Sequence, residues 1–115
     1  MINIYLGGKI SGLRPCVAKR QFASAQKRVE MACKKAGKTV CVINPCTQGF
    51  GDDWRVYMKS DIKKLVDCDV LVDIGNDDGT SKGLKLEKQI ARALKIKILD
   101  EPDFAEWIKQ ENLHG

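Results

Sequence analysis

Residues 2–12 have the sequence INIYLGGKISG, a short apolar, β-branched run that stops at two glycines. Such a run is typical of a buried β-strand, here residues 2–6, and the glycine-rich stretch after it predicts a loop. Three similar runs occur at residues 39–43, 70–74 and 96–99, each followed by Gly, Asn-Pro or acidic residues. We therefore expect four strands.

Apolar residues recur at steps of three and four between these runs, which predicts amphipathic helices. The first pattern begins near Ala18 and ends at Gly37, and the next two cover residues 54–66 and 82–95. Pro102 is suited to a first helical turn, so a last helix is expected from there through Ile108.

This alternation predicts a single small α/β domain over residues 1–115, a doubly wound Rossmann- or flavodoxin-like sandwich of three layers. We expect a four-stranded parallel sheet in the order 2-1-3-4. In such sheets ligands bind beyond the carboxyl ends of the strands where the winding reverses, which here is between the first and third strands. The loops at residues 7–15 and 75–83 meet there, so we expect the site between them.

The composition excludes several classes of function. Five cysteines without a Cys-x-x-Cys pair favour neither a disulfide scaffold nor a zinc site. The single histidine, His114, is one residue from the end of the sequence, where chains usually fray, so neither Ser-His-Asp nor Cys-His catalysis is expected. We expect no metal and no cofactor, and any acid–base chemistry would fall to carboxylates, Tyr or Lys.

The net charge of +5 permits an anionic partner, and nucleic acid, nucleotide and acidic protein all remain open. The lysines are dispersed and are not interleaved with aromatic residues, which argues against nucleic acid. No stretch approaches the ~18 apolar residues of a membrane span, and no signal-peptide pattern is present. We therefore expect no membrane contact and a cytoplasmic protein.

Two carboxylates lie on the apolar faces of predicted helices. Glu87 is in the middle of the arc that includes Leu84 and Ala91, and Asp61 lies beside Met58 in the helix before it. A carboxylate facing a core is costly unless it is paired, hydrogen-bonded or at a cavity wall. Glu87 could instead reach solvent at the sheet edge, and Asp61 could accept structural hydrogen bonds. Paired carboxylates with different pKa values are the usual apparatus for cleaving a glycosidic bond.

The loop after the first strand is a candidate anion site. Its backbone N–H groups, the Lys9 ammonium and the Ser11 hydroxyl could hold a phosphate, although the pattern is neither G-x-G-x-x-G nor a Walker loop. Ser81 opens the helix of Glu87, where it could cap the backbone or contact a phosphate. Asp77 and Asp78 could contact a base or only solvate their loop.

Several motifs together resemble the nucleoside 2-deoxyribosyltransferase superfamily, especially its branch of small nucleoside 5′-monophosphate N-glycosidases. They are Tyr5 through Gly12, Asn44-Pro45, Trp54-x-x-Tyr57 leading to Asp61, Cys68-Asp69, and Ser81-x-Gly83-x-x-x-Glu87 with Ala91. They span residues 2 to about 99. The Trp-Tyr-Asp segment looks most like short, often phage- or prophage-borne bacterial members.

The resemblance implies roles for individual residues. Glu87 matches the glutamate that attacks the anomeric carbon, Asp61 the aspartate that assists departure of the base, and Tyr5 the tyrosine that orients this pair. The implied substrate-binding residues are Gly7, Gly8, Lys9, Ser11, Gly12, Ser81 and Gly83, with Ser81 and Gly83 at the phosphate. Lys9 and Ser11 stand where the glycosidase branch tends to show Ser and Arg, and the loop at residues 76–80 is longer than in that branch.

The function expected from this resemblance is hydrolysis of the N-glycosidic bond of a (deoxy)nucleoside 5′-monophosphate, or transfer of its sugar, through a covalent glycosyl-Glu87 intermediate. A non-catalytic nucleotide-binding module, a nucleoside deoxyribosyltransferase and a structural or protein-interaction role remain as alternatives. A homodimer is also expected, with Trp54, Tyr57 and Met58 near its interface. These three side chains could instead fill the protomer's own core.

Overall fold

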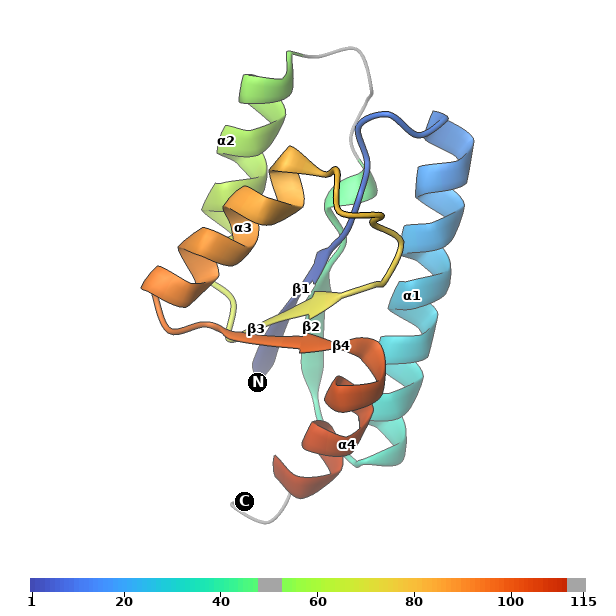
Figure 1. Ribbon diagram of the computed structural model, residues 1–115. Helices are drawn as coiled ribbons and strands as arrows, with labels where there is room; N and C mark the ends of the chain where they lie inside the picture. The colour runs from blue at the N-terminus through green and yellow to red at the C-terminus, as the bar shows by residue number, and fades with distance from the viewer. Residues whose placement is uncertain (48–52, 112–115) are drawn as a thin grey trace.

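Four parallel strands form one sheet in the order β2-β1-β3-β4 in the computed structural model, which describes residues 1–47 and 53–111 (Figure 1). The strands are β1 (Ile2–Gly7), β2 (Val40–Ile43), β3 (Val70–Asp73) and β4 (Lys97–Asp100). The other elements are α1 (Pro15–Lys35), the 3-10 helix η1 (Pro45–Thr47), α2 (Trp54–Leu65), α3 (Lys82–Ala93) and α4 (Glu101–Glu111). The predicted α/β class and strand order are confirmed.

Helices cover both faces of the sheet, with α1 and α4 on one side and α2 and α3 on the other (Figure 1). Successive side chains of a strand point to opposite faces, so β1 contributes to both layers. Ile4 and Leu6 pack in the cluster that includes α1 and α4, whereas Tyr5 packs in the cluster that includes α2 and α3. The neighbour of Tyr5 in β3 is Leu71, which lies in the same cluster. This alternation brings Tyr5 to the face where both predicted carboxylates lie.

Local chemistry explains where the helices begin and end. Gly37 has φ of 70° just after α1, the left-handed conformation that glycine adopts readily at a helix end. The end of α3 comes two residues before the predicted Lys95, because Lys95 has φ of 59° and the chain turns there toward β4. The start of α4 comes one residue before Pro102, because the Asp100 carboxylate accepts the Asp103 N–H at 3.0 Å.

Among residues 1–47 and 53–111, no helix is both long and apolar enough to cross a membrane. His114 lies outside the residues that the structure describes.

Candidate functional site

A cleft of about 720 Å³ lies beyond the carboxyl ends of β1 and β3. Its wall comes from the loop after β1, from Pro45 after β2, from α2 between Trp54 and Asp61, and from the start of α3 with the two residues before it. This is the point where the order of the strands reverses, as predicted for the two loops that meet there. The topology therefore places a cavity of substrate size at the expected edge of the sheet.

Asp61 and Glu87 both line this cleft, and each is 4% exposed. They come from neighbouring helices, α2 and α3, that cover the same face of the sheet. The alternative in which Glu87 reaches solvent at the sheet edge is wrong, because the apolar arc of α3 turns its side chain inward. Within the described residues, Asp61 and Glu87 are the buried carboxylates.

Glu87 is held by a hydrogen bond from Tyr5. The Tyr5 hydroxyl donates to Oε2 of Glu87, and the Tyr5 side chain is fully buried. Burial raises the pKa of Tyr5, and the negative charges of Glu87 and Asp61 raise it further. The tyrosine therefore keeps its proton and acts as a fixed donor to the carboxylate.

The two carboxylates have raised and unequal pKa values. Burial raises the pKa of Glu87 to about 8, with the charge of Asp61 adding to the rise and the Tyr5 hydrogen bond opposing it. Burial raises the pKa of Asp61 to about 6, against the nearby Lys64 ammonium. Between pH 6 and 8 the pair therefore holds about one proton, which lies mainly on Glu87, while Asp61 is mainly ionised. The site thus combines a proton donor with an ionised carboxylate.

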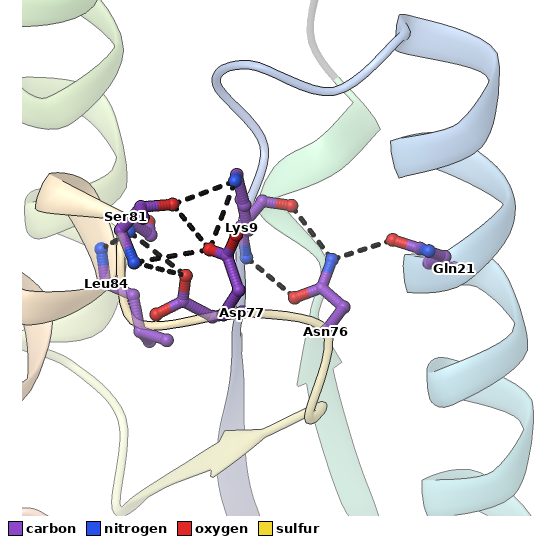
Figure 2. Close-up of polar contacts among 8 residues, drawn as sticks. Lys9, Gln21, Asn76, Asp77, Ser81 and Leu84 are labelled. Atoms are coloured by element: carbon purple, nitrogen blue, oxygen red, sulfur yellow. Dashed lines mark hydrogen bonds and ion pairs between the residues drawn. The ribbon is translucent and has the colours of Figure 1, made fainter.

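Ser81 caps the helix that carries Glu87. Its Oγ accepts the Leu84 N–H at 3.2 Å, so the capping role considered for this serine is present (Figure 2). A hydroxyl that accepts one hydrogen bond still has its own proton to donate. Asp77 Oδ1 accepts the Thr80 and Ser81 N–H groups at 3.2 and 3.0 Å. Asp77 therefore shapes the loop that leads into α3.

Asn76 joins the two loops that meet at the cleft (Figure 2). Its Oδ1 accepts the Lys9 N–H at 2.7 Å, and its Nδ2 donates to the Lys9 carbonyl at 2.9 Å and to Gln21 on α1 at 2.8 Å. The sequence analysis did not select Asn76. An Asn in a loop can accept from a backbone N–H and donate to a backbone C=O at the same time. This property is the signal that could have predicted the role of Asn76.

Lys9 does not line the cleft. Its Nζ donates to Thr80 Oγ1 at 2.9 Å and forms an ion pair with Asp78 Oδ1 at 3.3 Å. The hydrogen bond from the Thr80 hydroxyl, followed by the one from Lys9, lowers the pKa of Asp78 to about 2. In this structure Lys9 and Asp78 therefore tie the two loops together, and a contact of Lys9 with substrate stays a prediction.

The glycines of the predicted site have different roles. Gly8, Gly12 and Gly83 line the cleft together with Ser11, whereas Gly7 does not. A Cβ on Gly7 would lie 2.9 Å from Leu71 Cδ2 in the core. A Cβ on Gly83 would lie 3.2 Å from Met58 Sδ, so this glycine allows α3 to approach α2. Gly7 thus serves packing beneath the site.

Apart from Thr80 and Lys82, the remaining wall is apolar and aromatic, and the sequence analysis gave these side chains no role in binding a substrate. It is formed by Ile10, Leu13, Pro15, Pro45, Trp54, Tyr57, Met58 and Leu84. Across the described part of the chain, no three His, Cys, Asp or Glu side chains are grouped so that they could hold a metal ion.

The fold and the cleft define a small doubly wound α/β domain with a buried pair of carboxylates at its switch point. The chain belongs to the DUF4406 family, a domain of unknown function, whose family model matches residues 2–100. Searches of curated proteins and of solved structures find no match. The family match includes every residue of the predicted site.

Proposed function

We propose that this protein cleaves the N-glycosidic bond of a (deoxy)nucleoside 5′-monophosphate by a retaining, two-step route. The observation that carries the proposal is that Glu87 and Asp61 lie buried on the wall of one cleft, with Glu87 held by Tyr5. This arrangement supports glycosidic chemistry because it supplies a nucleophile and a proton donor without a metal or an imidazole.

In the first step a Glu87 oxygen attacks C1′, and the bond between C1′ and the base nitrogen breaks. The departing base takes a proton from Asp61 or from a group that Asp61 positions. This step needs an ionised Glu87 and a protonated Asp61, which is the minor of the two one-proton forms because the pKa of Glu87 is the higher. In the second step water attacks C1′, its proton returns to the pair, and Glu87 is released.

The start of α3 supports the phosphate end of the substrate. Backbone N–H groups at a helix N-terminus favour an anion, and Ser11, Ser81, Lys82 and Gly83 line the cleft there. Glu87 lies five residues after Lys82 on α3, which is about 7.5 Å along a helix axis. A nucleotide whose phosphate lies at Ser81 would therefore have its sugar near Glu87, and its base would lie against the apolar wall.

A symmetric homodimer forms part of this proposal. Trp54 lines the cleft and is 40% exposed, and Val56 is 55% exposed on the same first turns of α2. A second subunit that covered these side chains would enclose more of the ligand. Met58 does not contribute to such an interface, since it is buried against Gly83 in its own protomer.

Incubation with a panel of nucleoside 5′-monophosphates and the matching nucleosides, followed by chromatography of free base, tests the activity. We expect base release from at least one monophosphate and a loss of more than about 100-fold in Glu87→Gln, which cannot form the ester. Glu106→Gln, an exposed substitution of the same chemistry on α4, should keep wild-type activity.

The same experiment separates the alternatives. Tight binding of an intact nucleotide without base release, unchanged in Glu87→Gln, would identify a binding module and overturn the enzymatic proposal. Base exchange only in the presence of an acceptor base would identify a transferase. A mass-spectrometric adduct on Glu87 after incubation with a 2-fluoro-arabinosyl nucleotide would support the covalent step.

A further inference from the structure

A second groove of about 660 Å³ is lined by residues of α1 and α4. These two helices cover the face of the sheet opposite to α2 and α3 (Figure 1). Its apolar lining comes from Met31, Ala32 and Ala36 of α1 and from Ala105 of α4. Met31 is 54% exposed, an unusual position for a large apolar side chain on an otherwise charged helix. Methionine is adaptable, and it is common on surfaces that bind apolar partners.

The rim of this groove is basic, with Lys27, Arg28, Lys35 and Lys109. The surrounding segment accounts for the net positive charge of the chain. Residues 14–38 contain eight Lys or Arg and one Glu, a net +7, whereas the rest of the sequence has 12 Lys or Arg against 14 Asp or Glu, a net −2. The basic pI therefore reflects α1 and the residues next to it, and Lys27, Arg28 and Lys35 of this segment line the groove.

Two of the four rim cations are already neutralised. Arg28 donates two hydrogen bonds to Glu101, at 2.7 and 2.8 Å, and Lys109 pairs with Glu106 at 3.2 Å. Among the described residues, Lys27 and Lys35 have no carboxylate within ion-pair distance. They lie eight residues apart on α1, about 12 Å along the helix axis, with Met31 midway between them.

We propose that the α1/α4 groove binds an amphipathic helix of another protein that places apolar side chains on Met31 and acidic side chains at Lys27 and Lys35. A partner helix would match it with two acidic residues seven or eight positions apart and an apolar stripe at steps of three and four. Opposite charges at the rim would select the partner, and the apolar floor would supply affinity.

Charge and polarity argue against other occupants. Nucleic acid would find phosphate contacts only at the rim, because the floor offers neither hydrogen-bond donors nor aromatic rings. A second copy matches the groove poorly, because Val56 lies between Arg55 and Lys59 and Leu94 between Arg92 and Lys95, so these exposed apolar residues would bring cations to a basic rim. The segment that follows α4 does not match the basic rim either, because residues 112–115 contain no acidic side chain.

Fluorescence anisotropy with a labelled synthetic peptide tests the groove. The probe is a helical peptide of about 14 residues with a leucine stripe flanked by glutamates. We expect Lys27→Glu with Lys35→Glu to weaken binding at least tenfold, and Met31→Gln to weaken it several-fold without changing the charge. The matched control is Lys59→Glu with Lys63→Glu on α2, which changes the net charge equally and should leave binding within twofold.

Three outcomes would overturn the proposal: no binding of the peptide to the wild-type protein, equal binding of a peptide whose leucines are replaced by glutamine, or tighter binding of a 20-base-pair duplex DNA. Thermal unfolding of each variant shows whether it is folded. Base release does not depend on this surface. A negative result in the peptide-binding experiment therefore leaves the proposed enzymatic function untouched, and absence of base release leaves the groove proposal untouched.

Discussion

The Tyr5 hydroxyl on β1 donates a hydrogen bond to Oε2 of Glu87 on α3, which joins residues 82 positions apart in the sequence. The bond connects the central part of the sheet to the helix that carries the proposed nucleophile. Both side chains are buried, so water does not compete for the contact. Tyr5 therefore fixes the orientation of Glu87 and couples the stability of the domain to the proposed chemistry.

Replacement of Tyr5 by Phe keeps the ring volume but leaves Glu87 Oε2 without its donor. We expect the free energy of unfolding in urea to fall by about 1–3 kcal/mol at neutral pH, because the lost bond is buried and involves a carboxyl group. In a Glu87→Leu background the same change should have no destabilising effect. An equal loss in both backgrounds would show that Tyr5 acts through other contacts.

The stability of the protein should fall as the pH rises from about 4 to 8. Burial raises the pKa of Glu87 from 4.5 to about 8 and that of Asp61 from 3.8 to about 6, so in this window the folded state binds more protons than the unfolded state. We expect a loss on the order of 6 kcal/mol across the window. Urea unfolding at a series of pH values measures it.

Glu87→Gln should flatten this pH dependence, since glutamine does not titrate. The control Glu106→Gln changes an exposed carboxylate and should keep the wild-type slope. A free energy of unfolding that rises between pH 5 and 8 in the wild-type protein would contradict the raised pKa values.

The rate of base release should follow a bell-shaped pH profile with limbs near pH 6 and 8. These are the pKa values of Asp61 and Glu87, and the reaction needs the pair to hold one proton. The measured quantity is kcat/KM, which reports the free enzyme. Asp61→Asn should remove one limb and lower the rate by about 100-fold. A rate that increases steadily to pH 10 would show that no proton donor is required.

Gly8→Ala should destabilise the loops at the cleft. An added Cβ would lie 2.7 Å from Asn76 Oδ1 and 2.8 Å from Ile74 Cγ1, so the Asn76 contact with Lys9 could not form unchanged. We expect a loss of about 1–3 kcal/mol in urea unfolding. Ser11→Ala, an exposed change in the same loop, should stay within about 0.5 kcal/mol of wild type. Equal stability of the two variants would show that the loop adapts freely.

The proposed dimer predicts a mass of twice 12.8 kDa in light scattering at tens of micromolar protein. Trp54→Ala combined with Val56→Lys should shift the mass to the monomer, because both residues are exposed at the start of α2. Val66→Lys, an exposed valine just beyond the end of the same helix, is the control and should remain dimeric. A wild-type mass of 12.8 kDa would refute the assembly.

Most of the fold could be predicted from the sequence because its signals are local. Helical periodicity predicted the end of α1 at Gly37, two residues beyond the observed last residue Lys35. The same periodicity placed Glu87 and Asp61 on inward faces, as their 4% exposure confirms. The alternation of strands and helices predicted a parallel sheet, and the strand order chosen for it, 2-1-3-4, is the observed one. Boundaries shifted by one or two residues where a single φ value or cap, such as Asp100, decided the end of an element.

The details of the site depend on contacts between distant residues, which no local pattern encodes. Lys9 lies in a loop that looked suited to a phosphate, yet its ammonium reaches Thr80 and Asp78, because the two loops approach each other only when the sheet forms. The Asn76 contacts arise in the same way. The sequence by itself determined which faces of the helices are buried, since burial follows periodicity. Only the tertiary structure decided which side chains are in contact at the cleft, because these contacts depend on the distance and orientation between elements far apart in the chain.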